Sequence, residues 1–243
     1  YTTPAIATQP ANSSKCSGTN TTFTVVVTSP SGGLTYQWQE KVGSGSFTDL
    51  TNGGVYSTVT NATLTLTGVT TGMNGNKYRC VVGACSSPVI SAEADLIVDA
   101  PPVITLQPVA STICAGMTTT FSTAATMTGG TVKWQKETNA GSGSYADITN
   151  GGVYSGATTE TLMLTNVTIN DTGYRYRCVA TASGVCSPVN TSNALLTIRA
   201  IPTFTTQPID KTVCEGLTTS FSTSADFSGA PSSYQWQVSE SGN

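Results

Sequence analysis

A repeat with a period near 100 residues is the feature that most constrains how this chain can fold. The first cysteines of the repeats, Cys16, Cys114 and Cys214, stand 98 and 100 residues apart, and the segment TNGGVYS occurs unchanged at 51–57 and 149–155. A period of this length is typical of small independently folding domains and too long for a solenoid repeat. We therefore expect a first repeat at 1–100, a second repeat at 101–200, and the N-terminal part of an incomplete third repeat at 201–243.

Within one period, short segments of alternating apolar and polar residues are separated by glycine-rich turns. Such alternation is typical of strands with one buried face, and no segment has a helical period. The segments are rich in Thr, Val and aromatic residues, which favour strands. The sequence therefore predicts an all-β fold with about seven short strands per repeat, the pattern of a β-sandwich. The strands expected in the first repeat include 21–28, 34–41, 62–67, 76–82 and 94–99.

Composition limits the compartment and the partners. Charged residues make up only 9% of the chain and the formal net charge is −3, so a nucleic-acid partner is excluded. No apolar run approaches the roughly 20 residues that span a bilayer, and we expect no membrane insertion of this segment. Seven cysteines, at fixed places in the repeat, indicate disulfides and an extracellular, cell-surface protein. The chain begins at Tyr1 without a signal peptide, so we interpret it as part of a longer protein.

The residue types that catalysis requires are scarce. The chain has no histidine, so a nucleophile would lack its usual base, and it has no CxxC pair for zinc. Asp95 and Asp99 are the best oxygen ligands for calcium, but the second repeat has Arg199 at the position of Asp99, so we interpret both as solvated surface acids. The sequence predicts no catalytic residue, no cofactor and no metal ion, and therefore a protein that is not an enzyme.

Two Gly/Ser-rich loops, 43–49 and 141–147, each carry one aromatic residue, Phe47 or Tyr145. Binding residues lie disproportionately on surface loops, so these two residues are the candidate contacts for a ligand. We expect that ligand to be a surface glycan or another protein, and we expect neighbouring repeats of the same longer chain as further partners.

The segment 161–178, TLMLTNVTINDTGYRYRC, resembles the E-to-F stretch of immunoglobulin domains. In that stretch a leucine strand, an Asp-x-Gly corner and Tyr-x-Cys follow in order. The resemblance implies tandem immunoglobulin-like β-sandwiches. It also implies that Tyr78 and Tyr176 tie the E–F corner to the backbone. The core signature implied for the three repeats includes the tryptophans of strand C, Trp38, Trp134 and Trp236.

The chain departs from the immunoglobulin pattern at the strand-B cysteine. Its place is taken by Val25, Thr123 and Thr223. The cysteine that is present in each repeat lies nine residues earlier, which is about 30 Å of strand. We therefore expect the usual disulfide between strands B and F to be absent.

This variant resembles the immunoglobulin-like repeats of large cell-surface proteins of Bacteroidetes, including gliding-motility adhesins. The shared features are a V/I-C-E/A/S-G segment, the YQWQ strand at 36–39 and 234–237 (VKWQ at 132–135), and a late cysteine, Cys85 or Cys186. The resemblance implies a repeat region of a secreted adhesin or filament, acting as a stiff disulfide-stapled stalk. The alternative is a spacer or binding module attached to a secreted polysaccharide-degrading enzyme.

The same resemblance favours one pairing of the cysteines and leaves two alternatives open. Each favoured bond would close a loop of roughly 70 residues, worth roughly 4 kcal/mol in the chain-entropy model. The second pairing joins neighbours across the F–G hairpin, and the third joins adjacent repeats. The favoured bonds are Cys16–Cys85 and Cys114–Cys186, and the hairpin bonds would be Cys80–Cys85 and Cys178–Cys186.

Short links between the repeats determine the expected arrangement of the domains. Pro101, Pro102 and Pro202 stiffen these links by fixing φ, so we expect an extended rod. In the third repeat, strands A to C cannot bury their apolar face alone. We expect its aromatic residues to lack an opposing sheet, and the chain to continue.

Overall fold

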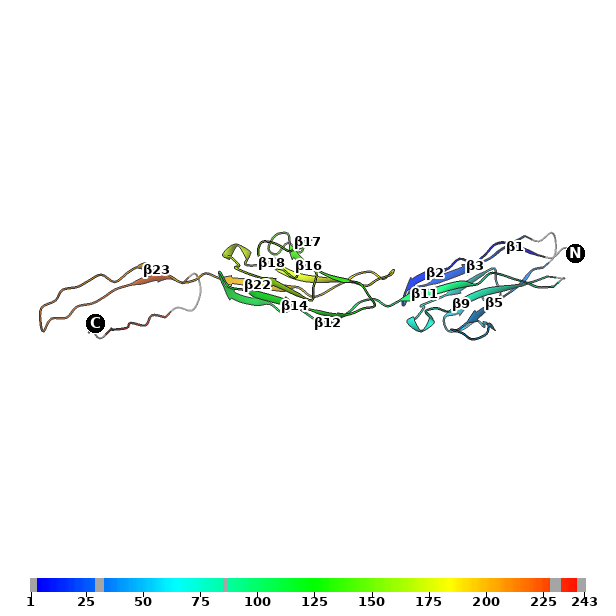
Figure 1. The fold of residues 1–243 in the computed structure, drawn as a ribbon, viewed down its shortest axis with the longest axis horizontal. Coiled ribbons are helices and arrows are strands. Elements are labelled where there is room, and N and C mark those ends of the chain that lie inside the picture. Colours follow the sequence, from blue (N-terminus) through cyan, green and yellow to red (C-terminus); the bar gives the residue numbers. More distant parts are fainter. Residues whose placement is uncertain (1–3, 29–32, 85–86, 228–232, 240–243) are drawn as a thin grey trace. The chain divides into compact units, whose positions relative to one another are not determined.

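The computed structural model of the chain describes residues 4–28, 33–84, 87–227 and 233–239. Within these residues the regular elements are strands and two 3-10 turns, η1 (Thr71–Met73) and η2 (Ile169–Asp171) (Figure 1). The chain forms two compact units. The first comprises Tyr1–Thr105, Ala125–Thr131 and Ala180–Asn190, and the second comprises Leu106–Ala124, Val132–Val179 and Thr191–Asn243.

The first repeat has two main sheets that enclose one core. The larger has the strand order β2-β11-β9-β5-β6, with β10 paired to β9, and the smaller has the order β3-β8-β7; β1 and β4 form a separate pair. The bounds are β1 Ala5–Thr8, β2 Ser13–Cys16, β3 Thr21–Thr24, β4 Val26–Thr28, β5 Thr35–Lys41, β6 Thr48–Asp49, β7 Tyr56–Ser57, β8 Thr63–Leu66, β9 Lys77–Gly83, β10 Val89–Ile90 and β11 Ala94–Asp99.

The second repeat has the same topology, strand for strand. Its larger sheet has the order β13-β22-β20-β16-β17, with β21 paired to β20, and its smaller sheet has the order β14-β19-β18, beside the pair β12-β15. The bounds are β12 Val103–Leu106, β13 Ser111–Cys114, β14 Thr119–Ser122, β15 Ala124–Thr126, β16 Thr131–Glu137, β17 Tyr145–Asp147, β18 Tyr154–Ser155, β19 Thr161–Leu164, β20 Arg175–Thr181, β21 Val189–Asn190 and β22 Ala194–Arg199.

Alternation places one face of each strand in the core. In β8 the residues Leu64 and Leu66 are fully buried, and in β9 Tyr78, Cys80 and Val82 are fully buried, as their spacing predicted. The buried rings stack across the sandwich, with centroids of Phe23 and Tyr78 4.8 Å apart. The second repeat repeats this contact at 5.0 Å, between Phe121 and Tyr176.

One strand pair in each large sheet is parallel and fixes where the leading cysteines lie. In the first repeat, β2 pairs with β11, so that Cys16 lies beside Asp99. In the second, β13 pairs with β22, so that Cys114 lies beside Arg199. Each leading cysteine therefore lies at the end of the sheet where the last strand of its repeat finishes.

The third segment contains β23 (Thr203–Thr206) and β24 (Ser224–Asp226), which pair antiparallel. Most of its aromatic side chains are exposed, as expected for strands without an opposing sheet. Trp236, predicted as a core residue, is 51% exposed because no second sheet covers it in the described residues, whereas Trp38 and Trp134 are completely buried. The other exposed rings of this segment include Phe204, Phe221 and Tyr234.

Candidate functional site

The disulfide of the structure joins Cys16 to Cys186, with their Cα atoms 4.9 Å apart and a sequence separation of 170. The predicted pairs Cys16–Cys85 and Cys114–Cys186 are therefore wrong in this structure, and Cys114 is free. Cys85 lies outside the described residues. The observed bond is the third alternative, because Cys16 belongs to the first sequence repeat and Cys186 to the second.

The sheet geometry explains why the predicted pairs do not form. In β11 the residue Ala94 lies opposite Tyr78, whereas Cys16 lies beside Asp99 at the far end of the strand. β9 runs antiparallel to β11 and so leads away from Asp99. About ten residues of strand, roughly 30 Å, separate the two ends. A disulfide requires Cα atoms within about 7 Å, so Cys16 can bond only to a cysteine that comes to the Asp99 end of the sheet.

The bonded cysteine hairpin is held by Asp99 within the first compact unit. The backbone N–H of Val185 donates to Asp99 Oδ2 at 2.9 Å, and the N–H of Ser17 donates to the Asp99 carbonyl at 2.9 Å. Gly184 has a φ of +104°, and a Cβ at this position would run into the Asp99 carboxylate. The hairpin therefore requires glycine where it approaches Asp99 most closely.

Two further cysteines, Cys80 and Cys178, are buried and unpaired. The hairpin bonds Cys80–Cys85 and Cys178–Cys186 are therefore absent. Burial raises the pKa of each thiol to about 11, so neither is reactive near neutral pH. Val25 and Thr123, at the strand-B positions of the usual B–F disulfide, are buried.

Two of the three tryptophans of the expected core signature, Trp38 and Trp134, are completely buried. The indole N–H of Trp38 donates to the Asn61 carbonyl and that of Trp134 to the Thr159 carbonyl, both at 2.9 Å. These bonds satisfy the one polar group of each ring within the core. The two rings are therefore packing elements, as predicted.

Tyr78 and Tyr176 are buried as predicted, but the predicted bond to the backbone is wrong. The Tyr78 hydroxyl donates to Glu40 Oε1 at 2.7 Å. The Tyr176 hydroxyl lies 3.3 Å from that of Tyr154. A side chain thus supplies the partner that the corner backbone supplies in the family pattern. Glu40 comes from the paired strand β5, and Tyr154 comes from β18 of the other sheet.

Glu40 is the centre of a polar cluster in the first repeat. Besides Tyr78, the Tyr56 hydroxyl and the Asn76 amide donate to Glu40 Oε1, at 2.7 and 2.8 Å. Burial, reinforced by the hydrogen bond to Glu40, raises the pKa of Tyr56 to about 12. The same causes raise the pKa of Tyr78 above its usual range.

The second repeat replaces this carboxylate with a cation. Lys136 stands at the position of Glu40, and its ammonium lies 3.8 Å from the ring centroid of Tyr174, which replaces Asn76. The ammonium is also 3.7 Å from Asp171 Oδ1. The same structural position therefore holds two different polar clusters. In the first repeat Glu40 accepts hydrogen bonds from its neighbours, and in the second repeat Lys136 lies over the ring of Tyr174.

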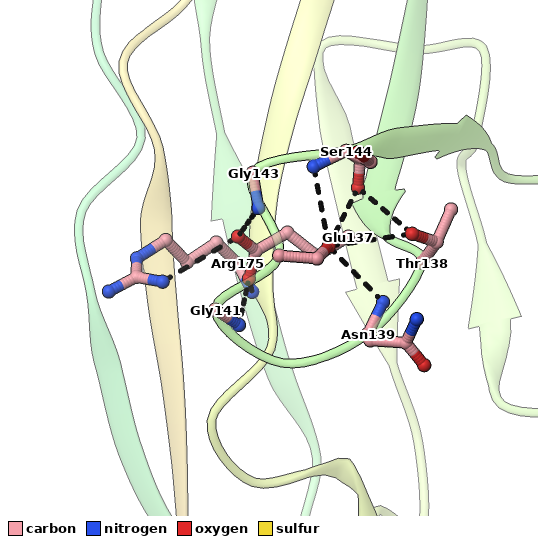
Figure 2. A network of polar contacts seen from close by, with 8 residues as sticks. Glu137, Thr138, Asn139, Gly141, Gly143, Ser144 and Arg175 are labelled. Carbon is pink, nitrogen blue, oxygen red and sulfur yellow. Dashed lines mark hydrogen bonds and ion pairs between the residues drawn. The ribbon is translucent and has the colours of Figure 1, made fainter.

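Glu137 is a buried carboxylate that organises a hairpin (Figure 2). It accepts hydrogen bonds from the backbone N–H groups of Gly141, Gly143 and Arg175 at 3.0–3.1 Å. Burial acts to raise the pKa of this carboxyl, but the three N–H donors and the Arg175 charge outweigh it and lower the pKa. The first repeat has Lys41 at this position and a shorter loop.

The predicted contact residues are half-buried beneath arginines. The Arg79 guanidinium lies 3.9 Å from the Phe47 ring centroid, and that of Arg177 lies 4.0 Å from the Tyr145 centroid. Gln39 accepts from Arg79 Nε at 2.8 Å and donates to Asp49 at 2.7 Å. The second repeat has the same chain of contacts through Gln135 and Asp147. The rings are thus parts of a cross-strand ladder, and the residues of the Gly/Ser tips are more exposed than the rings.

Among the described residues, no group of three or more His, Cys, Asp or Glu side chains could hold a metal ion. In the same part of the chain, no helix is long and apolar enough to cross a membrane.

The comparisons with known proteins identify the fold. No protein-family model matches the chain, and no curated protein matches it. A structure of three titin immunoglobulin domains, an E-to-A variant, matches with a TM-score of 0.55 and 20% identity over 84% of this chain and 69% of that one. Sidekick-1 immunoglobulin domains 1–5 match with a TM-score of 0.56 and 23% identity over 93% of this chain and 45% of that one.

The chain is a tandem of immunoglobulin-like β-sandwiches. Sidekick-1 domains 1–4 match equally well, with a TM-score of 0.56 and 22% identity over 80% of this chain. The chain spans about half the length of the Sidekick-1 structures. At these identities the likeness extends to the fold alone.

Proposed function

We propose that this chain is a non-catalytic repeat region of a secreted cell-surface adhesin or filament, in which it serves as a stiff, extended stalk. The observation that carries the proposal is the Cys16–Cys186 disulfide, because it closes a loop with a sequence separation of 170 that contains most of both complete repeats.

The disulfide determines how a pulling force passes through the chain. Tension applied between the termini enters at Cys16, crosses the sulfur–sulfur bond and continues from Cys186. Once this bond is taut, the residues between the two cysteines cannot add length to the chain, even if their sandwiches unfold. A stalk that bears force between a cell and a surface would gain a fixed length from this arrangement.

The bond and the composition also favour an extracellular location. Disulfides persist in oxidising compartments and are rare in the cytosol. Only 9% of residues are charged, so the surface relies on hydroxyl and amide groups. The ligand proposed for the loops 43–49 and 141–147 is a surface glycan or a protein.

Single-molecule stretching from the two termini tests the proposal. At about 3.6 Å per residue, reduction should lengthen the fully extended chain by about 600 Å, since the loop between Cys16 and Cys186 is then released. The variant Cys114→Ser should keep the oxidised behaviour, because Cys114 is outside the bond. Equal extended lengths before and after reduction would overturn the proposed load path.

A further inference from the structure

Each of the three repeats begins its sandwich with the same cysteine-containing turn, and the structure shows one of these turns covalently occupied. Cys16 is bonded to Cys186, whereas Cys114 and Cys214 are exposed and free. We propose that Cys114 is a covalent docking site for the late-cysteine hairpin of a further repeat of this same type, in the same polypeptide, as Cys16 is for the hairpin at 183–189.

The first support is that the turns at Cys16 and Cys114 have the same backbone. Ser17 N donates to the Asp99 carbonyl and Ala115 N to the Arg199 carbonyl, each at 2.9 Å. The glycines that follow, Gly18 and Gly116, have φ values of +87° and +80°, and both donate at 2.7 Å to the turn before the 3-10 helix. The geometry that presents the bonded Cys16 sulfur is therefore already formed at Cys114.

The second support is a pair of exposed apolar side chains near Cys114. At the first site, the depression beside Cys16 is lined by Thr19, Pro101, Val185 and Pro188, so the bound hairpin forms part of its wall. At the second site, Met117 and Ile201 stand where Thr19 and Pro101 stand, and they are 55% and 56% exposed. Two large apolar side chains beside an exposed thiol are suited to a hairpin with the Cys-Ser-Pro-Val sequence of residues 186–189.

One contact must differ between the two sites. Asp99 accepts the N–H of Val185 at the first site, but Arg199 stands in its place at the second. A guanidinium only donates hydrogen bonds. The hairpin that docks at Cys114 should therefore present a carbonyl or carboxylate oxygen to Arg199.

Bond formation needs an oxidant. The two thiols lose two protons and two electrons to the disulfide of a thiol oxidoreductase, which is reduced to a dithiol as the new sulfur–sulfur bond forms. Buried Cys80 and Cys178 cannot take part.

The proposal holds whether or not the chain is a load-bearing stalk, and mapping of the natural protein tests it. The full-length protein is isolated with its free thiols alkylated, digested without reductant and analysed by mass spectrometry. The expected result is Cys114 bonded to a cysteine that is followed by Ser-Pro or Ser-Ser-Pro in a later repeat. Alkylated Cys114, or a bond to any other cysteine, would overturn the proposal, as would an intact non-reduced mass of two linked chains.

A second measurement tests access in the 243-residue chain itself. An aromatic disulfide reagent should modify Cys114 and Cys214 in the folded protein and leave Cys80 and Cys178 unmodified. Protection of Cys114 in the folded chain would contradict an open docking site, whatever the result of the stretching experiment.

Discussion

At the scale of single residues, the most informative side chain is Glu137, the buried acceptor of three backbone N–H groups. Glu137→Gln places an amide N–H₂ among those donors, so we expect a loss of about 2 kcal/mol in the free energy of unfolding at pH 7. The measurement is urea denaturation. Lys41→Gln, at the matching position of the first repeat, is the control and should change the stability by less than about 0.5 kcal/mol.

The pH dependence of the stability difference between the wild type and Glu137→Gln tests whether the carboxylate charge is the cause. The pKa of Glu137 is lowered in the folded state, so its stabilisation is fully present above the unfolded pKa of about 4.3 and is lost as pH falls through the folded pKa. The stability difference between the wild type and Glu137→Gln should therefore shrink below about pH 4. A difference that stays constant down to pH 2 would show that the carboxylate charge is not the stabilising feature.

The second repeat has Lys136 and Tyr174 where the first has Glu40 and Asn76, which predicts that substitutions at these two positions have coupled effects on stability. Glu40→Lys alone should cost about 2 kcal/mol, because Tyr56, Asn76 and Tyr78 lose their shared acceptor. Adding Asn76→Tyr should recover about 1 kcal/mol by placing a ring under the ammonium, as Tyr174 does for Lys136. A double-mutant cycle by chemical denaturation measures the coupling, and strictly additive effects would contradict it.

Sequence patterns predict which residues are buried better than they predict polar partners. Alternation was sufficient to place Tyr78 in the core, since strand period alone decides the face, and the resemblance to strand C placed Trp38 there. The bond from Tyr78 to Glu40 was missed because it depends on the register of β5 against β9, where Glu40 lies opposite Tyr78. The repeat itself held a signal, because Glu40 changes to Lys in step with the change of Asn76 to Tyr.

At the scale of elements, the conformation of the two glycines on either side of β18 gives a matched comparison. Gly152 and Gly156 both have positive φ, +58° and +76°, but only at Gly156 would a Cβ collide with a backbone carbonyl, that of Thr161. We expect Gly152→Ala to cost about 1 kcal/mol, from backbone conformation alone, and Gly156→Ala to cost about 3 kcal/mol, from conformation and collision together. Thermal denaturation compares them, and equal losses would contradict the packing of this turn.

Most strands were predictable because their alternation is uninterrupted. The expected strand 34–41 is β5 (Thr35–Lys41), and the expected strand 94–99 is β11 (Ala94–Asp99). The expected strand 21–28 is instead divided into β3 and β4, which belong to different sheets. A strand that changes partners midway keeps its alternation, so the division leaves little trace in the sequence.

At the scale of the whole molecule, the fold class followed from the repeat and its motifs, whereas the disulfide did not. The resemblance favoured a bond within each repeat, whereas the structure joins Cys16 of the first repeat to Cys186 of the second. The partner of Cys16 depends on which repeat supplies the hairpin with the late cysteine. The spacing of cysteines within a single repeat carries no information about that choice.

The disulfide should stabilise the chain strongly because its loop is long. In the chain-entropy model, a loop with a separation of 170 residues contributes about 5 kcal/mol. Cys186→Ser should therefore lower the midpoint of denaturation, and added reductant should have no further effect on that variant. Cys114→Ser, which removes an unpaired cysteine, is the matched control and should leave the midpoint unchanged. Equal midpoints for the two variants would contradict the assigned bond.

Non-reducing peptide mapping of the purified, thiol-blocked chain tests the central claim most directly. The structure predicts one linked pair of peptides, containing Cys16 and Cys186, together with alkylated Cys80 and Cys178. A linked pair that joins Cys16 to Cys85, or Cys80 to Cys85, would show that each repeat closes its own disulfide and would contradict the account.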